Sequence, residues 1–163
     1  MGCGKNTVGS RLANKLGYEF YDMDKYIESR EGKKISEIFA TDGEAYFRKL
    51  ETLACHELMK KENLVLACGG GTVLKQENVD ALHQGGGRVF FLKVPVPALK
   101  ERLKNDKVRP LLQVPNRNER IDELYSQRLP KYLSAADEVI DAGAPPGWVA
   151  SKMYEEIMSV SVK

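Results

Sequence analysis

The chain has 163 residues, of which 42% are hydrophobic and 29% charged, and its formal net charge is +2. A chain of this length suits one domain with a proper hydrophobic core, and none of its apolar runs is long enough to cross a membrane. Because the net charge is small, it gives no reason to expect nucleic acid or an anionic membrane as a partner, and any anion must be bound by a local arrangement of side chains.

The first half of the chain is predicted to contain helices and two strands. The apolar spacing of KNTVGSRLANKL is that of a helix, which Gly17 closes, and NLVLAC reads as a buried strand that runs into three glycines. In chain order, the predicted elements are a helix at 5–16, a strand at 18–22, helices at 24–31, 35–40 and 44–61, and a strand at 63–68.

The second half continues this alternation. Its predicted elements are a helix near 75–84, a strand at 88–94, helices at about 96–104 and 118–134, a strand at 137–142 and a last helix from about 147. The polar stretch 105–117, with two prolines, is predicted to be a mobile loop. Strands separated by helices indicate βαβ units, so the expected fold class is α/β, one domain over 1–163 with a parallel sheet between layers of helices.

The three cysteines, Cys3, Cys55 and Cys68, are an odd number at unrelated spacings. They follow no metal-binding pattern, and the sequence shows no signal peptide. We therefore expect reduced thiols in a cytoplasmic protein.

The opening residues MGCGKNTVG resemble the end of a phosphate-binding loop. The full pattern is G-x-x-x-x-G-K-[ST], in which backbone N–H groups and the lysine bind phosphates and the hydroxyl binds Mg²⁺. Gly4-Lys5 supplies the closing pair, but the opening glycine would fall before residue 1, and Asn6 stands in the hydroxyl position. The run opens a helix, whose N-terminus favours a bound phosphate. The simpler alternative is a helix cap with a surface lysine.

Two carboxylates follow the first predicted strand. Asp22 and Asp24 are two residues apart, so in an extended segment both face the carboxyl-terminal edge of the sheet, where α/β proteins bind ligands. Such a pair can hold hydrated Mg²⁺ and accept a proton from a hydroxyl group. The alternative is a helix N-cap for 25–31, which Asp24 could serve.

Further candidates lie on the helix at 44–61 and after the strand at 63–68. Arg48 and Glu51 share one helix face, so Glu51 can orient Arg48 for bidentate binding of an anion; a surface ion pair is the alternative. The run 69–71 is all glycine, which lets backbone N–H groups approach a ligand closely, although a tight turn is also possible. The run 85–87, also all glycine, lies at the opposite edge and is expected to be a C-cap and linker.

Three arginines complete the set of candidates. Arg109 lies in the predicted loop, where it could neutralise charge on a transferring phosphoryl group. Arg102 ends the preceding helix, and Arg128 lies in the next one, ahead of Pro130 and Tyr132. Each arginine alone is better explained as a solvated side chain than as a ligand, so the functional interpretation depends on their combination.

The order of these motifs is very similar to that of the shikimate kinases, a family with the nucleoside-monophosphate-kinase-like P-loop fold. The resemblance covers the whole chain and rests on GKNTVG, FYDMD, IFATDGEAYFRKLE, GGGTV, VRPLL, QRLPKY and PPGWV. It implies transfer of the γ-phosphoryl group of ATP to the 3-hydroxyl of shikimate, a step towards chorismate and the aromatic amino acids. It also implies a three-layer fold with sheet order 2-3-1-4-5.

The resemblance also assigns roles to individual residues. Asp24 takes the hydroxyl proton and binds shikimate, Arg48 and Arg128 bind its carboxylate, and Asp22 with Asn6 lies at Mg²⁺. The remaining substrate-side positions are Glu51, Gly69, Gly70 and Gly71. On the nucleotide side, the resemblance assigns the phosphates to the loop residues Gly2, Cys3, Gly4, Lys5 and Thr7 and to the lid residue Arg109. Lys5 and Arg109 also act in catalysis. Arg102 and Pro146 flank the adenine.

Two departures from the family pattern affect these expectations. Asn6 replaces the hydroxyl residue, so weaker Mg²⁺ binding is expected. The family's central strand precedes the phosphate loop, and no residues stand there in this sequence. The strands at 63–68 and 88–94 are therefore expected to lose their shared neighbour, with poor stability and impaired ATP binding if Met1 is the natural start.

Two alternatives to this assignment remain open. One is a kinase of the same fold that acts on another small molecule, such as gluconate or a nucleotide; the other is a non-catalytic relative. In either case we expect a monomer without nucleic-acid or membrane partners.

Overall fold

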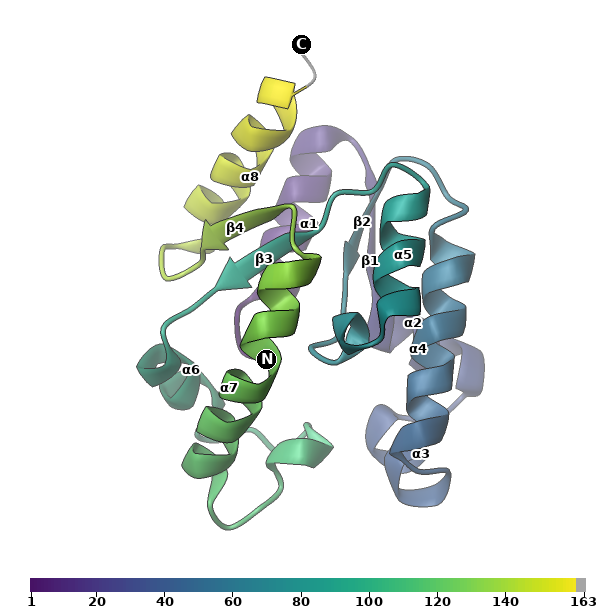
Figure 1. The fold of residues 1–163 in the computed structure, drawn as a ribbon, viewed down its shortest axis with the longest axis vertical. Helices are drawn as coiled ribbons and strands as arrows, with labels where there is room; N and C mark the ends of the chain where they lie inside the picture. Colours follow the sequence, from purple (N-terminus) through teal and green to yellow (C-terminus); the bar gives the residue numbers. More distant parts are fainter. Residues whose placement is uncertain (161–163) are drawn as a thin grey trace.

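The computed structural model describes residues 1–160 of the chain (Figure 1). Its helices are α1 (Lys5–Leu16), α2 (Met23–Glu31), α3 (Ile35–Thr41), α4 (Glu44–Leu58), α5 (Gln76–Gln84), α6 (Val96–Leu103), α7 (Arg117–Ala135) and α8 (Pro146–Val160). Its strands are β1 (Glu19–Asp22), β2 (Leu64–Ala67), β3 (Phe90–Lys93) and β4 (Glu138–Asp141), and short 3-10 turns lie at η1 (Thr72–Leu74) and η2 (Pro110–Leu112). None of the described helices is long and apolar enough to cross a membrane.

The strands form two separate parallel pairs. β1 pairs with β2, with Glu19 opposite Leu64, and β3 pairs with β4, with Phe90 opposite Glu138. Within residues 1–160 no strand joins the two pairs. The expected α/β class with parallel strands is confirmed. The order expected from the family places these pairs on the two sides of one further strand.

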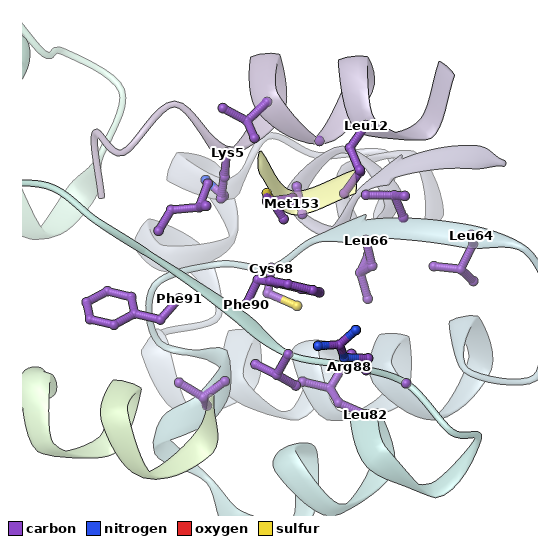
Figure 2. A pocket seen from close by; sticks show the side chains of 18 of the residues that line it. Lys5, Leu12, Leu64, Leu66, Cys68, Leu82, Arg88, Phe90, Phe91 and Met153 are labelled. Carbon is purple, nitrogen blue, oxygen red and sulfur yellow. The ribbon is translucent and has the colours of Figure 1, made fainter. Parts of the chain in front are cut away.

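A cavity of about 810 Å³ lies between β2 and β3. Side chains of α1, α5 and α8 also line it, and they surround it from both faces of the broken sheet (Figure 2). This cavity explains why β2 is less buried than predicted: only Ala67 is fully buried, and Leu64, Val65 and Leu66 are half-buried. The prediction of a fully buried strand at 63–68 is therefore wrong, because one edge of the strand faces the cavity instead of another strand.

Each strand pair has its own hydrophobic core. Beside β1 and β2, the helices α2 to α5 (Figure 1) enclose a cluster that includes Met23, Ile38 and Cys55, each fully buried. Beside β3 and β4, the helices α1, α6, α7 and α8 enclose a second cluster, which includes Leu112 and Val149. The burial of these side chains is the main stabilising contribution to each half.

Most predicted elements are confirmed, and the differences lie at their ends. α4 ends at Leu58 rather than at 61, because Met59 leaves the helix as its C-cap. α2 begins at Met23, and its N-cap is Asp22, whose Oδ1 accepts the backbone N–H of Asp24 at 2.9 Å. The alternative in which Asp24 serves as the N-cap is therefore wrong, and the Asp24 carboxylate is free for another role.

The loop predicted at 105–117 is anchored to the second core. The 3-10 turn η2 places Leu112 in that core with no exposed surface. Arg117, which begins α7 instead of ending the loop, donates hydrogen bonds to the carbonyls of Leu103 and Lys104 at 3.1 and 2.6 Å. The loop is therefore held to α6 at one end and to the core at its middle.

A strand added ahead of Met1 should stabilise the chain, because it would give partners to the inner edges of both strand pairs. We expect a version with about ten added residues, which include a strand-forming apolar segment, to melt at least about 4 °C higher, the shift that roughly 1–2 kcal/mol produces in a domain of this size. Thermal melting followed by circular dichroism measures this. A polar, glycine-rich extension of equal length is the control, and equal melting temperatures for both extensions would contradict the prediction.

Candidate active site

The glycine run after β2 is the centre of the candidate site. Gly69 is close to two carboxylates: Asp24 Oδ1 and Glu51 Oε1 each lie 3.5 Å from the position that a Cβ on Gly69 would take. Arg128 Nη1 lies 3.3 Å from the corresponding position on Gly70. A Cβ on Gly71 would overlap the guanidinium of Arg48. Four side chains, one from α2, two from α4 and one from α7, therefore meet one short backbone segment, as the sequence pattern predicts.

Arg48 is held in place by carboxylates on its own helix. Its Nη1 donates to Glu51 Oε1 at 2.6 Å, and its Nη2 donates to Glu44 Oε1 at 3.1 Å. Glu51 is only 1% exposed, and its Oε2 has no hydrogen-bond partner among the described residues. The alternative of a solvated surface pair is therefore wrong for this contact, because one partner is buried. The pair fixes the guanidinium of Arg48 against Gly71.

Arg128 and Tyr132 form the α7 side of the site. Arg128 is 7% exposed, and the Tyr132 hydroxyl donates to the carbonyl of Gly70 at 2.6 Å. The ring of Tyr132 also packs against Phe91 of β3, with centroids 5.2 Å apart. The buried position of Arg128 favours a role as a ligand over the alternative of a solvated side chain, since a buried cation needs a partner of opposite charge.

The surroundings of Asp24 raise the pKa of its carboxyl group, which favours proton uptake. Its partial burial raises the pKa of Asp24 above the ordinary value, and the charge of Asp22 raises it further, whereas Lys5 and Arg109 oppose the shift. Burial also raises the pKa of Glu51, against the effect of Arg48. A carboxylate with a raised pKa beside cationic groups is suited to accept a proton.

The phosphate loop joins this site through α1. Gly4 precedes the helix with φ 80°, a left-handed conformation that favours glycine, and α1 begins at Lys5. The first N–H groups of a helix have no intrahelical partners and are available to an anion.

Cys3 packs against the second core, and Thr7 is exposed on the first turn. Lys5 is near enough to Asp24 to affect its pKa.

Arg102 has a structural contact that its predicted role does not include. Its Nη1 donates to the carbonyl of Gly2 at 3.0 Å, which ties α6 to the phosphate loop. A Cβ on Gly2 would come within 3.1 Å of Leu103. Pro146 is exposed at the start of α8, and its position beside a nucleotide base, together with Arg102, stays a prediction.

Asn6 and Asp22, the predicted metal ligands, bind each other. Asn6 Nδ2 donates to Asp22 Oδ2 at 2.6 Å, while Asp22 Oδ1 accepts the N–H groups of Asp24 and Lys25. Among the described residues no three His, Cys, Asp or Glu side chains gather as a metal site. One carboxylate and one amide oxygen fit Mg²⁺ only where nucleotide phosphates and water supply the other ligands, as is usual for this ion.

Arg109 lies in the loop before η2 and is paired within that loop. Its guanidinium forms an ion pair with Asp106, whose Oδ1 also accepts the backbone N–H of Arg109 at 2.8 Å. The charge of Arg109 nevertheless acts on the pKa of Asp24 and of the Met1 amino group, so it lies near the site. Sequence reasoning missed Asp106, although its position three residues before Arg109 was a usable signal.

The fold and the site define an α/β protein that binds a small anion beside a phosphate loop. A profile of the protein family described as Shikimate kinase matches residues 1–158. The shikimate kinase of Aromatoleum aromaticum is 43% identical over 164 residues, which cover 100% of this chain and 93% of the relative, and that of Synechococcus elongatus is 42% identical over 98% of this chain and 84% of the relative. This chain belongs to the shikimate kinase family.

Solved structures agree with this assignment. The structure of shikimate kinase from Acinetobacter baumannii in complex with shikimate is 40% identical, with a TM-score of 0.95 over 100% of this chain and 91% of that one. A gluconokinase from Sinorhizobium meliloti is 19% identical with a TM-score of 0.54, a likeness that concerns the fold alone. The alternative of a gluconate kinase therefore gains no support from this comparison.

Replacement of Asp24 by asparagine should stabilise the protein at neutral pH. Because the folded pKa of Asp24 is raised, its contribution to stability is fully present below about pH 4 and is lost as the pH rises through the folded pKa. We expect D24N to melt a few degrees above the parent chain at pH 7.5, with a difference that vanishes near pH 4. Thermal melting across this pH range is the measurement, with the exposed D80N as control. A lower melting temperature for D24N at pH 7.5 would show that the ionised carboxylate is stabilising.

Proposed function

We propose that this chain transfers the γ-phosphoryl group of ATP to the 3-hydroxyl of shikimate, which gives shikimate 3-phosphate and ADP. The observation that carries the proposal is the contact of Asp24, Arg48 and Arg128 with three consecutive glycines. A carboxylate and two planar cations around one small space match a hydroxylated acid. The shikimate complex of the Acinetobacter baumannii relative supports this choice of substrate.

The substrate carboxylate binds between the two arginines of the site. A guanidinium presents its N–H donors in a plane and can bind both oxygens of a carboxylate at once. Arg48 is already oriented by Glu51, and Arg128 is buried beside Tyr132, so little side-chain freedom is lost when the acid binds. Gly71, without a Cβ, leaves the space that the Arg48 guanidinium takes, and Gly70 lies beside Arg128, so the acid lies against the backbone of these two glycines.

Asp24 accepts the proton of the reacting hydroxyl. The hydroxyl oxygen forms a bond to the γ-phosphorus, the bond from that phosphorus to the bridging oxygen breaks, and ADP leaves with its electron pair. Lys5 and Arg109 neutralise the charge that builds up on the phosphoryl oxygens. Because Arg109 is paired with Asp106, its loop presents the guanidinium in a fixed direction.

The nucleotide and its metal bind on the phosphate-loop side. The loop from Gly2 to Thr7 holds the phosphates, with adenine between Arg102 and Pro146. Asp22 and Asn6 would hold Mg²⁺, which would neutralise phosphate charge. The hydrogen bond between Asn6 and Asp22 has to open before the amide and carboxylate oxygens can both face a cation. The protein acts as a monomer in the cytoplasm, without nucleic-acid or membrane partners.

A coupled assay of ADP release tests the proposed substrate. We expect ADP release that depends on shikimate and is not supported by gluconate or nucleoside monophosphates. In R128K, the KM for shikimate should rise about tenfold or more, because the bidentate contact is lost, while the KM for ATP changes less than about twofold. R120K, at a half-buried arginine of the same helix that pairs with Glu123, is the control. ADP release at the same rate with and without shikimate would overturn the assignment of the substrate. The absence of ADP release with every acceptor would instead indicate a non-catalytic relative.

The metal dependence tests the role of Asn6. We expect N6S to need several-fold less Mg²⁺ for half-maximal rate, because the substitution removes the amide that occupies Asp22 and restores a hydroxyl ligand. N14S, at an exposed position of the same helix, should behave like the parent chain. An unchanged Mg²⁺ requirement in N6S would contradict this role.

A further inference from the structure

Tyr132 and Arg128 contact the same glycine from one face of α7. They are four residues apart, a spacing that places two side chains next to each other on a helix. The Tyr132 hydroxyl oxygen lies 3.1 Å, and Arg128 Nη1 lies 3.3 Å, from the position that a Cβ on Gly70 would take. The phenol and the guanidinium therefore meet at one point of the candidate site.

Arg128 is a buried cation without a carboxylate partner. It is 7% exposed, and among residues 1–160 it forms no ion pair. Arg48, by contrast, pairs with both Glu44 and Glu51. Because these carboxylates offset the charge of Arg48, the uncompensated positive charge of the two arginines lies on Arg128. The site therefore holds one buried cation for a negative charge that a ligand brings.

The Tyr132 hydroxyl is a neutral group placed beside this cation. It donates its proton to the carbonyl of Gly70 at 2.6 Å, so its oxygen keeps lone pairs for an N–H donor. Burial raises the pKa of Tyr132, and the charge of Arg128 opposes this shift. The phenol therefore stays protonated at neutral pH. A neutral oxygen can orient the guanidinium of Arg128 without cancelling its charge, whereas a carboxylate would cancel it.

The same hydroxyl restricts the backbone of the glycine run. Gly70 has no side chain to limit its conformation, and the hydrogen bond from Tyr132 holds its carbonyl. In a trans peptide, the C=O of Gly70 and the N–H of Gly71 point in opposite directions, so this bond also sets the direction of that N–H. Within residues 1–160, the N–H groups of Gly70 and Gly71 donate to no acceptor. They are therefore available to a ligand beside Arg128.

Packing holds the ring of Tyr132 in place independently of its hydroxyl. The ring lies against Phe91 of β3, with centroids 5.2 Å apart and ring planes at 47°. The substitution Y132F keeps this ring and removes only the hydroxyl. One substitution therefore separates the role of the hydroxyl from the role of the ring in the core.

We propose that Tyr132 is a positioning residue that makes the site selective for an ionised carboxylate. Its hydroxyl holds the carbonyl of Gly70 and the guanidinium of Arg128 in fixed relative positions. One carboxylate then receives the guanidinium and the free backbone N–H groups together. A neutral amide of the same acid loses the charge-assisted part of this contact. The role rests on the proposed function, because it takes shikimate as the acid.

Calorimetric titration of Y132F with shikimate tests this role. We expect the Kd to rise about tenfold, because the buried carbonyl and guanidinium both lose a polar partner. The carboxamide of shikimate should bind the parent chain more weakly than the acid does, and Y132F should reduce this preference several-fold. Because the preference is a ratio measured on one variant, a partial loss of folded protein does not change it. Y125F, at a half-buried tyrosine of the same helix that packs against the second core, is the control and should bind both ligands like the parent chain.

A double-mutant cycle tests whether Tyr132 acts through Arg128. In the R128K background, Y132F should weaken shikimate binding by less than about threefold, because the guanidinium that the hydroxyl orients is already absent. Equal factors in the R128K chain and in the parent chain would mean that the hydroxyl acts on the glycine run alone, and would overturn the proposal.

Two further results would also overturn the proposal. One is a Kd for shikimate in Y132F that matches the parent value, and the other is equal weakening of the acid and of its carboxamide. The coupled assay of ADP release separates this role from the proposed activity. A parent chain that binds shikimate but releases no ADP would contradict the activity and leave the titrations as the test of Tyr132. A parent chain that binds no shikimate would overturn both.

Discussion

The contact between the Arg48 guanidinium and the backbone of Gly71 is the interaction on which the candidate site depends. It is possible only because residue 71 has no side chain, since a Cβ there would overlap the guanidinium. In the same way, Gly69 lies close to the carboxylates of Asp24 and Glu51, and Gly70 lies close to the guanidinium of Arg128. Three glycines weaken a strand end and add chain entropy, so the fold gives up stability at this point for a space that cations and carboxylates share.

The electrostatics of the site follow from this close approach. Glu51 is buried and accepts a hydrogen bond from Arg48, which fixes the guanidinium beside Gly71. Burial raises the pKa of both Asp24 and Glu51, so two carboxylates are kept in a place where ionisation is unfavourable. The positive charges of Lys5 and Arg109 offset part of the free-energy cost of ionising Asp24. The phosphates of a nucleotide would supply the negative charge that balances these two cations. Groups with perturbed pKa values are often found at functional sites.

Local elements were predictable from the sequence, because their signals are local. The bounds of α1 match the prediction, since the apolar spacing and the left-handed Gly17 define both the helix and its end. The convergence of Asp24, Arg48 and Arg128 also followed, because parallel strands and their loops bring such residues to one edge. The half-burial of β2 could not be predicted from its apolar residues, which report propensity and not the presence of a neighbouring strand. The bond between Asn6 and Asp22 and the pairing of Arg109 with Asp106 depend on side-chain directions that no periodicity specifies.

The most direct test of this account is a crystal structure of the chain grown with shikimate. The account predicts that the acid lies against Gly70 and Gly71, with its carboxylate between the guanidinium groups of Arg48 and Arg128 and a hydroxyl within hydrogen-bond distance of Asp24. Density for the acid in the cavity between β2 and β3, or a carboxylate that contacts neither arginine, would contradict the central claim that these distant parts of the chain form one binding site.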